Sequence, residues 1–578
     1  MIIPYHAFVH IHFFLNFTDC FFAFLIWCIK LVLSIESSSM EKIILWVPNF
    51  SEGRNKQVIE QIQNEALKIP GCILLDSNSG YSTHRTIFTF AGSPVVILEA
   101  ALRASKLAFE LIDMSQHVGE HPRIGALDVS PFIPVKGVTL EECVEYSKTF
   151  GQRLASTLDV PVYLYGRSSD KEYRNKVPQI REGEYESLKG KLLVTDWKPD
   201  YGPARFVPTW GASIVGCRDF LIPFNVNVLS TKEQAHTIAM NIRESGRGIN
   251  LPGKLKHVQA LGWMLEEDNM AQISTNILDF HSTPIYQVYE EALKDSKEMK
   301  LAVIGSEIIG IVPIQALLDC AKYYIETEDL MILDEESKIK LAIDRLGLNT
   351  VKPFDRKNQI LEYKLREKIS KPGYKDMKIN DFIALVGSRS PVPGGGAVSA
   401  LVASLGTSLT CMVGLLSQGT RKLEANNSTV KKILPAIYEN QFELLDYIDK
   451  DSQAFKNVLA VNRREYKDSA EKSREKESAL QNATEVPLEL ARKISKLWDG
   501  LIVLSTILNP QAISDLQVSV RLLHASIYGC KYNVLINLKS CQDATFTNKT
   551  RVEISEISSL ADDYMEKILG NLEEKLSI

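Results

Sequence analysis

The segment VVILEAALRASKLAFELIDM, residues 95–114, places small and apolar side chains at helical spacing and predicts a long helix. Another helix is predicted to begin after Thr139, because Glu142 three residues later completes a capping box. A shorter helix is predicted at Gln57–Lys68, and strand-like runs lie between the helices, at Ile43–Val47, Cys72–Asp76, Thr86–Phe90, Leu127–Val135 and Val160–Tyr165. The order βαββαβ, followed by one more αβ pair, predicts an α+β sandwich rather than a Rossmann unit.

A similar order recurs from about residue 220, as a repeat of pattern without a repeat of sequence. Ser230 and Glu233 are spaced to cap a helix, and Pro284 lies near the first turn of another, where its missing N–H costs nothing. The predicted strands of this region are Phe220–Leu229, His257–Leu265, Ala271–Phe280 and Leu301–Ile309. We therefore expect a second βαββαβ-like subdomain.

Beyond a charged segment with two prolines, Lys352–Lys378, which predicts a linker, the sequence indicates no strand and favours an all-α helical bundle. The uncharged run up to Leu416 is long enough to span a membrane, but its serines and threonines favour a buried helix in close contact with others. The predicted domains are an extension (1–39), two α+β subdomains (40–220 and 221–365), a linker (366–373) and a helical domain (374–578).

Residues 1–39 differ in composition from the rest. No Lys or Arg precedes their apolar core, which argues against a signal peptide. Asp19 and Lys30 leave about ten clean apolar residues where a membrane span needs about 20. We expect an extension that arises from a start-site error ahead of Met40, with a weak membrane anchor as the alternative.

Composition excludes several classes of protein. The 578 residues are 45% hydrophobic and 24% charged, as in soluble globular proteins, and have length for roughly three to five domains. A net charge of −5 gives no indication of nucleic-acid binding. Nine scattered cysteines without a C-x-x-C pair predict reduced intracellular thiols, with neither a disulfide framework nor a metal site.

The loop GEHPRIGALD, residues 119–128, is the first candidate site. It combines a histidine, His121, which titrates near neutral pH, with Arg123, whose fork of donors can fix a carboxylate. Such a loop suits proton transfer beside an anionic substrate. A turn with a surface histidine explains these residues equally well, so both interpretations stay open.

Asp451 is the second candidate, on a helix predicted from about Pro435 to Val461. The apolar positions of that helix are Ile437, Leu444, Ile448, Phe455 and Leu459. Their spacing places Asp451 on the buried face and Asp449 toward a polar edge. Desolvation raises the pKa of a buried carboxyl, which suits a general acid. A structural aspartate bonded to a neighbouring helix is the alternative.

The third candidate is a loop with two glycines and two prolines, in which Phe206 and Trp210 would offer flat faces to a ring ligand. An ordinary connecting loop would look much the same. Its residues are Gly202, Pro203, Ala204, Arg205, Phe206, Val207, Pro208, Thr209, Trp210 and Gly211. A further turn, Pro393–Gly396, could present backbone N–H groups to an anion at a helix start, but it lacks the ending of a P-loop.

Several of these segments together resemble one family closely, the bifunctional formimidoyltransferase-cyclodeaminases of histidine breakdown. The resemblance runs from Met40 almost to the C-terminus. The stretches that carry it are Val47–Gly53, Gly119–Asp128, Gly202–Gly211, Thr231–His236, Pro393–Gly396 and Tyr532–Leu538. It implies a transfer of the formimino group from N-formimino-L-glutamate to tetrahydrofolate, and then a cyclisation to 5,10-methenyl-tetrahydrofolate with release of ammonia.

The resemblance also implies roles for residues. His121 would accept the N5 proton of the folate, Asp451 would donate a proton to the leaving amine, and the loop Gly202–Gly211 would bind folate. Members of this family are ring-shaped octamers that use polyglutamylated folate without a metal. They are cytoplasmic, and in animals they associate with the Golgi, so a cytoskeletal or centrosomal association is a further expectation.

The chain departs from the family pattern at three positions. Asn78 replaces a common acid, His84 replaces an asparagine, and Arg205 replaces a small residue of the folate loop. These differences concern the transferase site more than the deaminase site. An enzyme with only the deaminase site fully active, a non-catalytic scaffold that keeps the fold, and an anchored membrane protein are therefore the alternatives.

Overall fold

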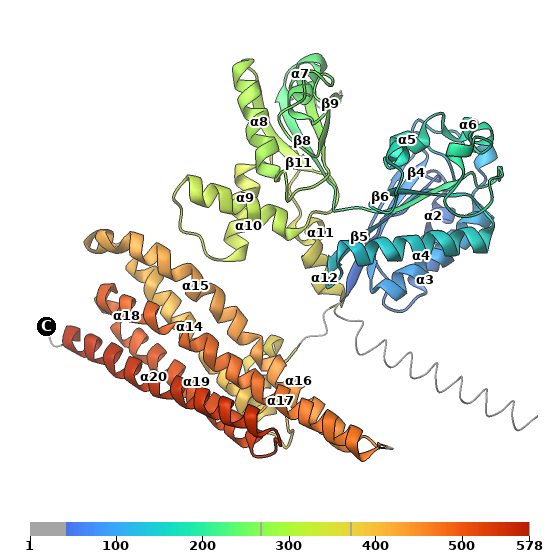
Figure 1. Cartoon of the computed structure of the whole chain (residues 1–578). Helices are drawn as coiled ribbons and strands as arrows, with labels where there is room; N and C mark the ends of the chain where they lie inside the picture. The colour runs from blue at the N-terminus through green and yellow to red at the C-terminus, as the bar shows by residue number, and fades with distance from the viewer. Residues whose placement is uncertain (1–41, 266–268, 370–372, 467, 577–578) are drawn as a thin grey trace, which may run out of the picture. The chain divides into compact units, whose positions relative to one another are not determined.

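The computed structural model describes residues 42–265, 269–369, 373–466 and 468–576, so the predicted extension 1–39 lies outside the described residues. The chain forms two compact units. The first contains the described residues up to Leu330 and Glu335–Ile369, and the second contains Met331–Asp334 and the chain from Ser370 onward. The first unit has mixed α+β structure and the second is helical, which confirms the predicted fold class (Figure 1).

A seven-stranded sheet forms the first half of the first unit, in the order β1-β4-β2-β5-β7-β6 with β3 paired to β4. Only β5 with β7 and β6 with β7 are parallel. The strands are β1 (Ile43–Trp46), β2 (Asn49–Phe50), β3 (Ile73–Gly80), β4 (Arg85–Gly92), β5 (Leu127–Lys136), β6 (Val162–Gly166) and β7 (Ser213–Cys217).

Helices cover both faces of this sheet. On one face lie α2 (Lys56–Leu67), α3 (Pro94–Leu111) and α4 (Leu140–Leu158), over a core that includes Trp46 stacked on Phe90. The capping box of Thr139 and Glu142 forms at the start of α4 as predicted. The short helices α5 (Val177–Arg181) and α6 (Glu184–Lys191), which the periodicity did not indicate, cover the other face through Ile180 and Leu188.

The second half of the first unit is a four-stranded antiparallel sheet in the order β11-β8-β10-β9. Its strands are β8 (Ile222–Leu229), β9 (Val258–Leu265), β10 (Met270–Ile277) and β11 (Ala302–Ile308), with helices α7 (Lys232–Ile242), α8 (Ile285–Glu298), α9 (Ile314–Thr327) and α10 (Glu335–Arg345). The capping box of α7 is formed by Thr231 and Gln234, one residue later than predicted, because Thr231 rather than Ser230 is the residue that precedes the helix.

The predicted linker is helical over much of its length, so that prediction is wrong there. Helix α11 (Arg356–Gln359) and helix α12 (Leu361–Ile369) fill the segment that the charge pattern assigned to a linker. Leu361 and Leu365, one helical turn apart, are buried against Leu45 and Ile133 of the first sheet. The lysines at 364 and 368 also donate to the carbonyl oxygens of Leu75 and Leu74, so apolar and charged side chains together attach this segment to the first unit.

The second unit is a bundle around α14 (Gly395–Ser417), which packs against α15 (Asn427–Leu445), α16 (Tyr447–Arg463) and α19 (Ile513–Leu538). The other helices are α13 (Ile379–Val386), α17 (Ser469–Ser495), α18 (Trp498–Ile507) and α20 (Ala544–Leu576). Helix α14 is long and apolar enough to cross a membrane, but more than half of its most apolar window is buried in the bundle. At Gly406 a methyl group would lie 3.1 Å from the carbonyl oxygen of Ser519, so small residues permit close helix contact.

Candidate active sites

His121 lies in the loop between a 3₁₀ helix, Met114–Gln116, and β5, and its side chain is half-buried. Its Nδ1 is 2.8 Å from the carbonyl oxygen of Pro122. The Nη1 atom of Arg85 is 2.7 Å from Nδ1 and 3.0 Å from Nε2 of the ring. Burial, and then the positive charge of Arg85, lowers the pKa of His121. The imidazole is therefore held neutral near pH 7, the form that accepts a proton.

Asp128, which is 1% exposed, lies between two guanidinium groups. Its Oδ2 is 2.5 Å from Nη2 of Arg181 on α5 and 3.6 Å from Nη1 of Arg85 on β4, and its Oδ1 accepts a bond from the backbone of Ile124. Burial lowers the pKa of Arg85 to about 10, which leaves that guanidinium charged at neutral pH. Sequence reasoning missed Arg85 and Arg181 as site residues because only the fold brings them to His121.

Arg123, which the sequence offered as a carboxylate ligand, has its donors occupied within the protein. Its guanidinium forms two bonds of 2.9 and 2.7 Å with Glu186 and one of 3.1 Å with Glu184, both on α6. Its remaining bonds go to His117, whose Nδ1 accepts from Nε. Arg123 therefore fastens α6 to the loop, and that part of the sequence interpretation is wrong.

The departure at His84 lies next to Arg85, and the departure at Asn78 lies on β3, the strand paired with β4. The ring of His84 stacks on that of His117, with 4.3 Å between centroids, and its Nε2 is 3.2 Å from Oε1 of Glu52. His84 adopts a φ of 51°, in the left-handed region where asparagine, aspartate and histidine are enriched among residues other than glycine. Asn78 is exposed on β3, opposite Ile87 of β4. His84 is thus held next to Arg85 by its contacts with His117 and Glu52.

The loop Gly202–Gly211 meets the His121 loop directly. Gly211 forms an isolated bridge with Gly125, and the carbonyl of Trp210 accepts a bond of 2.8 Å from Ala126. Gly211 has a φ of 76°, and a Cβ there would lie 2.1 Å from the carbonyl oxygen of Ile124. Glycine is therefore required at this contact. The structure brings together two candidate segments that are far apart in sequence.

The aromatic residues of this loop do not both face a ligand. Trp210 is fully buried, packs on Phe109 and donates to Ser213, so the expectation that its face is open to a ring ligand is wrong. Burial of a large indole ring contributes much apolar contact area, and the Trp210 ring contributes it to the core. Phe206 is half-buried against Tyr185, and the exposed Arg205 pairs with Asp159.

Asp451 on α16 lies against the first turn of α14. Its carboxylate accepts a hydrogen bond from the backbone N–H of Ala397, and a Cβ at Gly396 would lie 2.0 Å from its Oδ1. Burial raises the pKa of Asp451 to about 6. The anion at the turn Pro393–Gly396 is thus a side chain of the protein itself, held where it can be either charged or protonated near neutral pH.

The apolar stripe used to place Asp451 is only partly correct. The helix is interrupted at Asp446, and Phe455 is 37% exposed, whereas Ser452 and Val458 are buried. Asp451 is nevertheless largely buried, because the turn before α14 closes over it.

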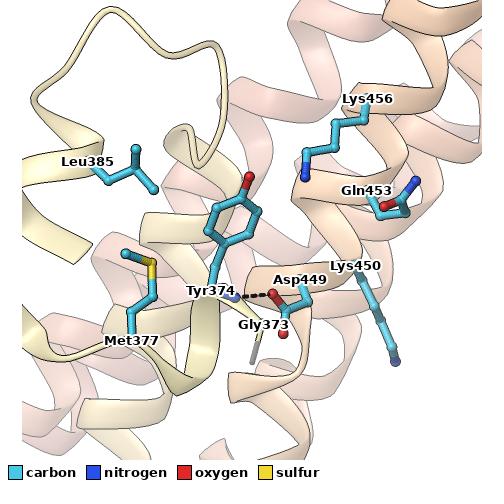
Figure 2. Close-up of a pocket in the computed structure, with 8 residues that line it drawn as sticks. All are labelled: Gly373, Tyr374, Met377, Leu385, Asp449, Lys450, Gln453 and Lys456. Atoms are coloured by element: carbon cyan, nitrogen blue, oxygen red, sulfur yellow. Dashed lines mark hydrogen bonds between the residues drawn. The ribbon is translucent and has the colours of Figure 1, made fainter. Parts of the chain in front are cut away.

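Asp449 lines a different cavity of about 800 Å³ in the second unit (Figure 2). Its Oδ1 accepts a bond of 2.7 Å from the backbone N–H of Tyr374, and the Lys456 ammonium lies 4.7 Å from the centre of the Tyr374 ring. The other lining residues are Gly373, Met377, Leu385, Lys450 and Gln453. The cavity wall carries both a negatively charged carboxylate and positively charged lysines, so its lining does not favour a ligand of one particular charge.

Comparison with known proteins identifies the chain. Three family models match it in succession: the N-terminal subdomain of the formiminotransferase domain at 43–218, the formiminotransferase domain at 223–366 and formiminotransferase-cyclodeaminase at 378–556. The formimidoyltransferase-cyclodeaminase of Rattus norvegicus is 46% identical over 93% of this chain and 100% of its own length. The chain belongs to the formimidoyltransferase-cyclodeaminase family.

Other relatives match either one half of the chain or nearly all of it. A glutamate formimidoyltransferase of Streptococcus pyogenes is 43% identical over 50% of this chain and 95% of its own length. The formimidoyltransferase-cyclodeaminase of Dictyostelium discoideum is 44% identical over 93% of this chain and 100% of its own length. The α+β unit thus corresponds to the formimidoyltransferase part of the family name, and the helical unit to the cyclodeaminase part.

Among residues 42–265, 269–369, 373–466 and 468–576, no group of three or more His, Cys, Asp or Glu side chains is arranged to hold a metal ion.

Proposed function

We propose that this chain catalyses two consecutive reactions on tetrahydrofolate, one in each unit. The first transfers the formimino group of N-formimino-L-glutamate to N5 and releases glutamate. The second closes the ring to 5,10-methenyl-tetrahydrofolate and releases ammonia. The observation that carries the proposal is that each compact unit holds its own group suited to proton transfer, the half-buried neutral His121 in one and the largely buried Asp451 in the other.

In the transfer, N5 of tetrahydrofolate attacks the formimino carbon, and His121 removes the proton that N5 loses. The N5–C bond forms, the bond from that carbon to the glutamate nitrogen breaks, and the protonated imidazole returns its proton to the departing amine. A lowered pKa keeps the imidazole unprotonated at neutral pH and makes the imidazolium a stronger acid toward the departing amine, although it also makes the imidazole a weaker base.

In the cyclisation, N10 attacks the same carbon and the terminal nitrogen leaves as ammonia. The N10–C bond forms and N10 loses its proton. The terminal nitrogen takes up that proton and a second one from the protonated form of Asp451, and its bond to the carbon then breaks. With a pKa of about 6, a useful fraction of the carboxyl is protonated near neutral pH, whereas an ordinary aspartate would be almost fully ionised. The contact with the backbone N–H of Ala397 favours the charged carboxylate and partly offsets the effect of burial on the pKa of Asp451.

Tetrahydrofolate would lie along the loop Gly202–Gly211, because that loop is joined to the His121 loop at Gly125. We extend the proposal to a polyglutamylated cosubstrate, to a homo-octamer and to a cytoplasmic location with Golgi association. These three points rest on family resemblance alone.

The decisive experiment is a paired assay of the purified full-length chain. Glutamate release from N-formimino-L-glutamate measures transfer, and ammonia release from 5-formimino-tetrahydrofolate measures cyclisation. Both activities are expected. Folate binding without either activity would indicate a scaffold, and cyclisation alone would indicate that Asn78, His84 or Arg205 has impaired the transferase site.

A further inference from the structure

Positive charge exceeds negative charge beside His121. In the part of the chain that the structure describes, Asp128 is the one carboxylate within ion-pair distance of Arg85 and Arg181. The Nε atoms of both arginines are also buried without a hydrogen-bond partner. Two guanidinium groups therefore share one carboxylate, and a second anion at this position would complete the pairing.

Arg85 also contacts the ring nitrogen of His121 whose lone pair would accept a proton. A carbonyl oxygen only accepts, so the contact with Pro122 places the ring proton on Nδ1 and leaves the lone pair on Nε2, 3.0 Å from Nη1 of Arg85. In the other tautomer the lone pair is on Nδ1, 2.7 Å from the same Nη1. In either case the guanidinium faces the nitrogen that would accept a proton.

We propose that Arg85 and Arg181 bind the α-carboxylate of the formimino donor, and that this anion draws Arg85 away from His121 and frees the base. The proposal rests on the proposed transferase activity. It makes Arg85 a binding residue whose contact with the substrate also releases the base. The base would then be available only when a donor is in place.

The α-carboxylate is the group that fits this position. In N-formimino-L-glutamate a single carbon separates it from the nitrogen that leaves, and that nitrogen must come close to His121 to receive a proton. Arg85 already contacts the His121 ring, so its guanidinium is within reach of the same carboxylate. The γ-carboxylate lies farther along a flexible chain.

The two arginines differ in how firmly they are held. Arg181 is 2.5 Å from Asp128, whereas Arg85 is 3.6 Å away and is held at Nη2 by the neutral side-chain oxygen of Asn49. A charged pair is stronger than a bond to a neutral amide. An incoming carboxylate is therefore expected to move Arg85 and to leave Arg181 against Asp128.

The test uses the full-length chain, the variants Arg85→Gln and Arg85→Lys, and two donors. One donor is N-formimino-L-glutamate and the other is N-formimino-4-aminobutyrate, which lacks the α-carboxylate. The wild type should prefer the first donor by roughly 10–100-fold in kcat/KM, the range expected for bonds to a charged group. Arg85→Gln should lose most of that preference while the KM for tetrahydrofolate changes little. Arg85→Lys should keep part of it, because a lysine retains the charge without the fork.

A second readout is the pH profile of kcat/KM, which reports the free enzyme. The charged groups that face His121 are Arg85, Arg181 and Asp128, and Arg85 opposes protonation of the ring. Removing its charge should move the acid limb to higher pH. Arg153→Gln is the matched control, because Arg153 pairs with Glu99 on the surface of α3 and α4.

The outcomes separate the two proposals. An Arg85→Gln enzyme that folds, transfers and still prefers the α-carboxylate as strongly as the wild type overturns this inference. A wild type that transfers nothing overturns the proposed function instead. Circular dichroism shows whether the variant is folded, and unchanged cyclisation by the helical unit shows that the effect is confined to the first unit. If Arg85→Gln is misfolded, the donor preference of Arg85→Lys decides, and a preference equal to that of the wild type overturns the inference.

Discussion

The carboxylate of Asp451 on α16 accepts a hydrogen bond from the backbone N–H of Ala397 in the first turn of α14. The bond favours the charged carboxylate and burial opposes it, and burial is the larger effect. A single residue therefore both joins two helices and carries an exchangeable proton.

Asp451→Asn should abolish proton donation and keep the bond to Ala397, because the amide oxygen still accepts. We expect ammonia release to fall by roughly 10²–10⁴-fold, the range for one general acid, with formimino transfer unchanged. Stopped assays of both half-reactions on one preparation measure this. Equal loss of both activities would mean that the residue serves the fold rather than one reaction.

The same substitution should also stabilise the protein, most of all at alkaline pH. The pKa of Asp451 is raised from 3.8 when unfolded to about 6 when folded, so burying the ionised carboxylate costs stability that grows between these two pH values and is complete above pH 6. Asp451→Asn should raise the free energy of unfolding by roughly 1–3 kcal/mol at pH 8 and by about half as much at pH 5. Thermal melts at the two pH values check the sign, with Asp563→Asn, at an exposed position on α20, as the control.

His121→Ala should lower the rate of formimino transfer by roughly 10²–10⁴-fold through loss of the general base. Cyclisation of added 5-formimino-tetrahydrofolate should continue at the wild-type rate, since Asp451 belongs to the other unit. Glutamate release and ammonia release are followed separately. A transfer rate within threefold of the wild type would remove His121 from the mechanism.

Gly396→Ala should damage the deaminase site alone. The added methyl group would lie 2.0 Å from Oδ1 of Asp451, so the carboxylate must move or the helices must separate, at a cost of roughly 1–3 kcal/mol. Ammonia release should fall and the bundle should melt at lower temperature. Gly570→Ala, on α20 with nothing within 4 Å of the new Cβ, is the matched control and should gain up to about 1 kcal/mol.

The double substitution Asn78→Asp with His84→Asn should alter glutamate release and leave ammonia release unchanged. His84→Asn removes the stacking on His117 and the ring contact with Glu52, and asparagine tolerates the left-handed backbone at that position. Turnover of N-formimino-L-glutamate and of 5-formimino-tetrahydrofolate are the two measurements. If neither rate changes, His84 does not compensate for the acid that Asn78 replaces.

Sequence periodicity predicted the regular elements well and the contacts between them poorly. The helix expected at Val95–Met114 is α3, Pro94–Leu111, because its apolar face repeats over many turns. In contrast, Arg85 and Arg181 reach His121 only through strand pairing and a short helix, and no spacing along the chain announces that meeting. Trp210 shows the same limit. An aromatic side chain in a loop rich in proline and glycine can contact a ligand or belong to the core, and the sequence does not distinguish the two; the structure shows Trp210 fully buried.

The structure confirms the predicted burial of Asp451, but the apolar stripe that predicted it is only partly correct. The stripe that located it predicted burial for Phe455, which is 37% exposed, and ran through the interruption at Asp446. The burial of the carboxylate comes from Gly396 and its neighbours, a segment that the sequence suggested as an anion site without indicating which anion.

The bridge between Gly125 and Gly211 limits how this enzyme can change. It couples the proposed folate loop to the loop that carries His121, so a substitution that reshapes one also displaces the other. Acceptance of a different pterin and speed of proton removal would then not evolve independently. Adaptation of the transferase half to a new one-carbon acceptor would require paired changes on both sides of this bridge, and the deaminase half, which is a separate compact unit, does not contain it.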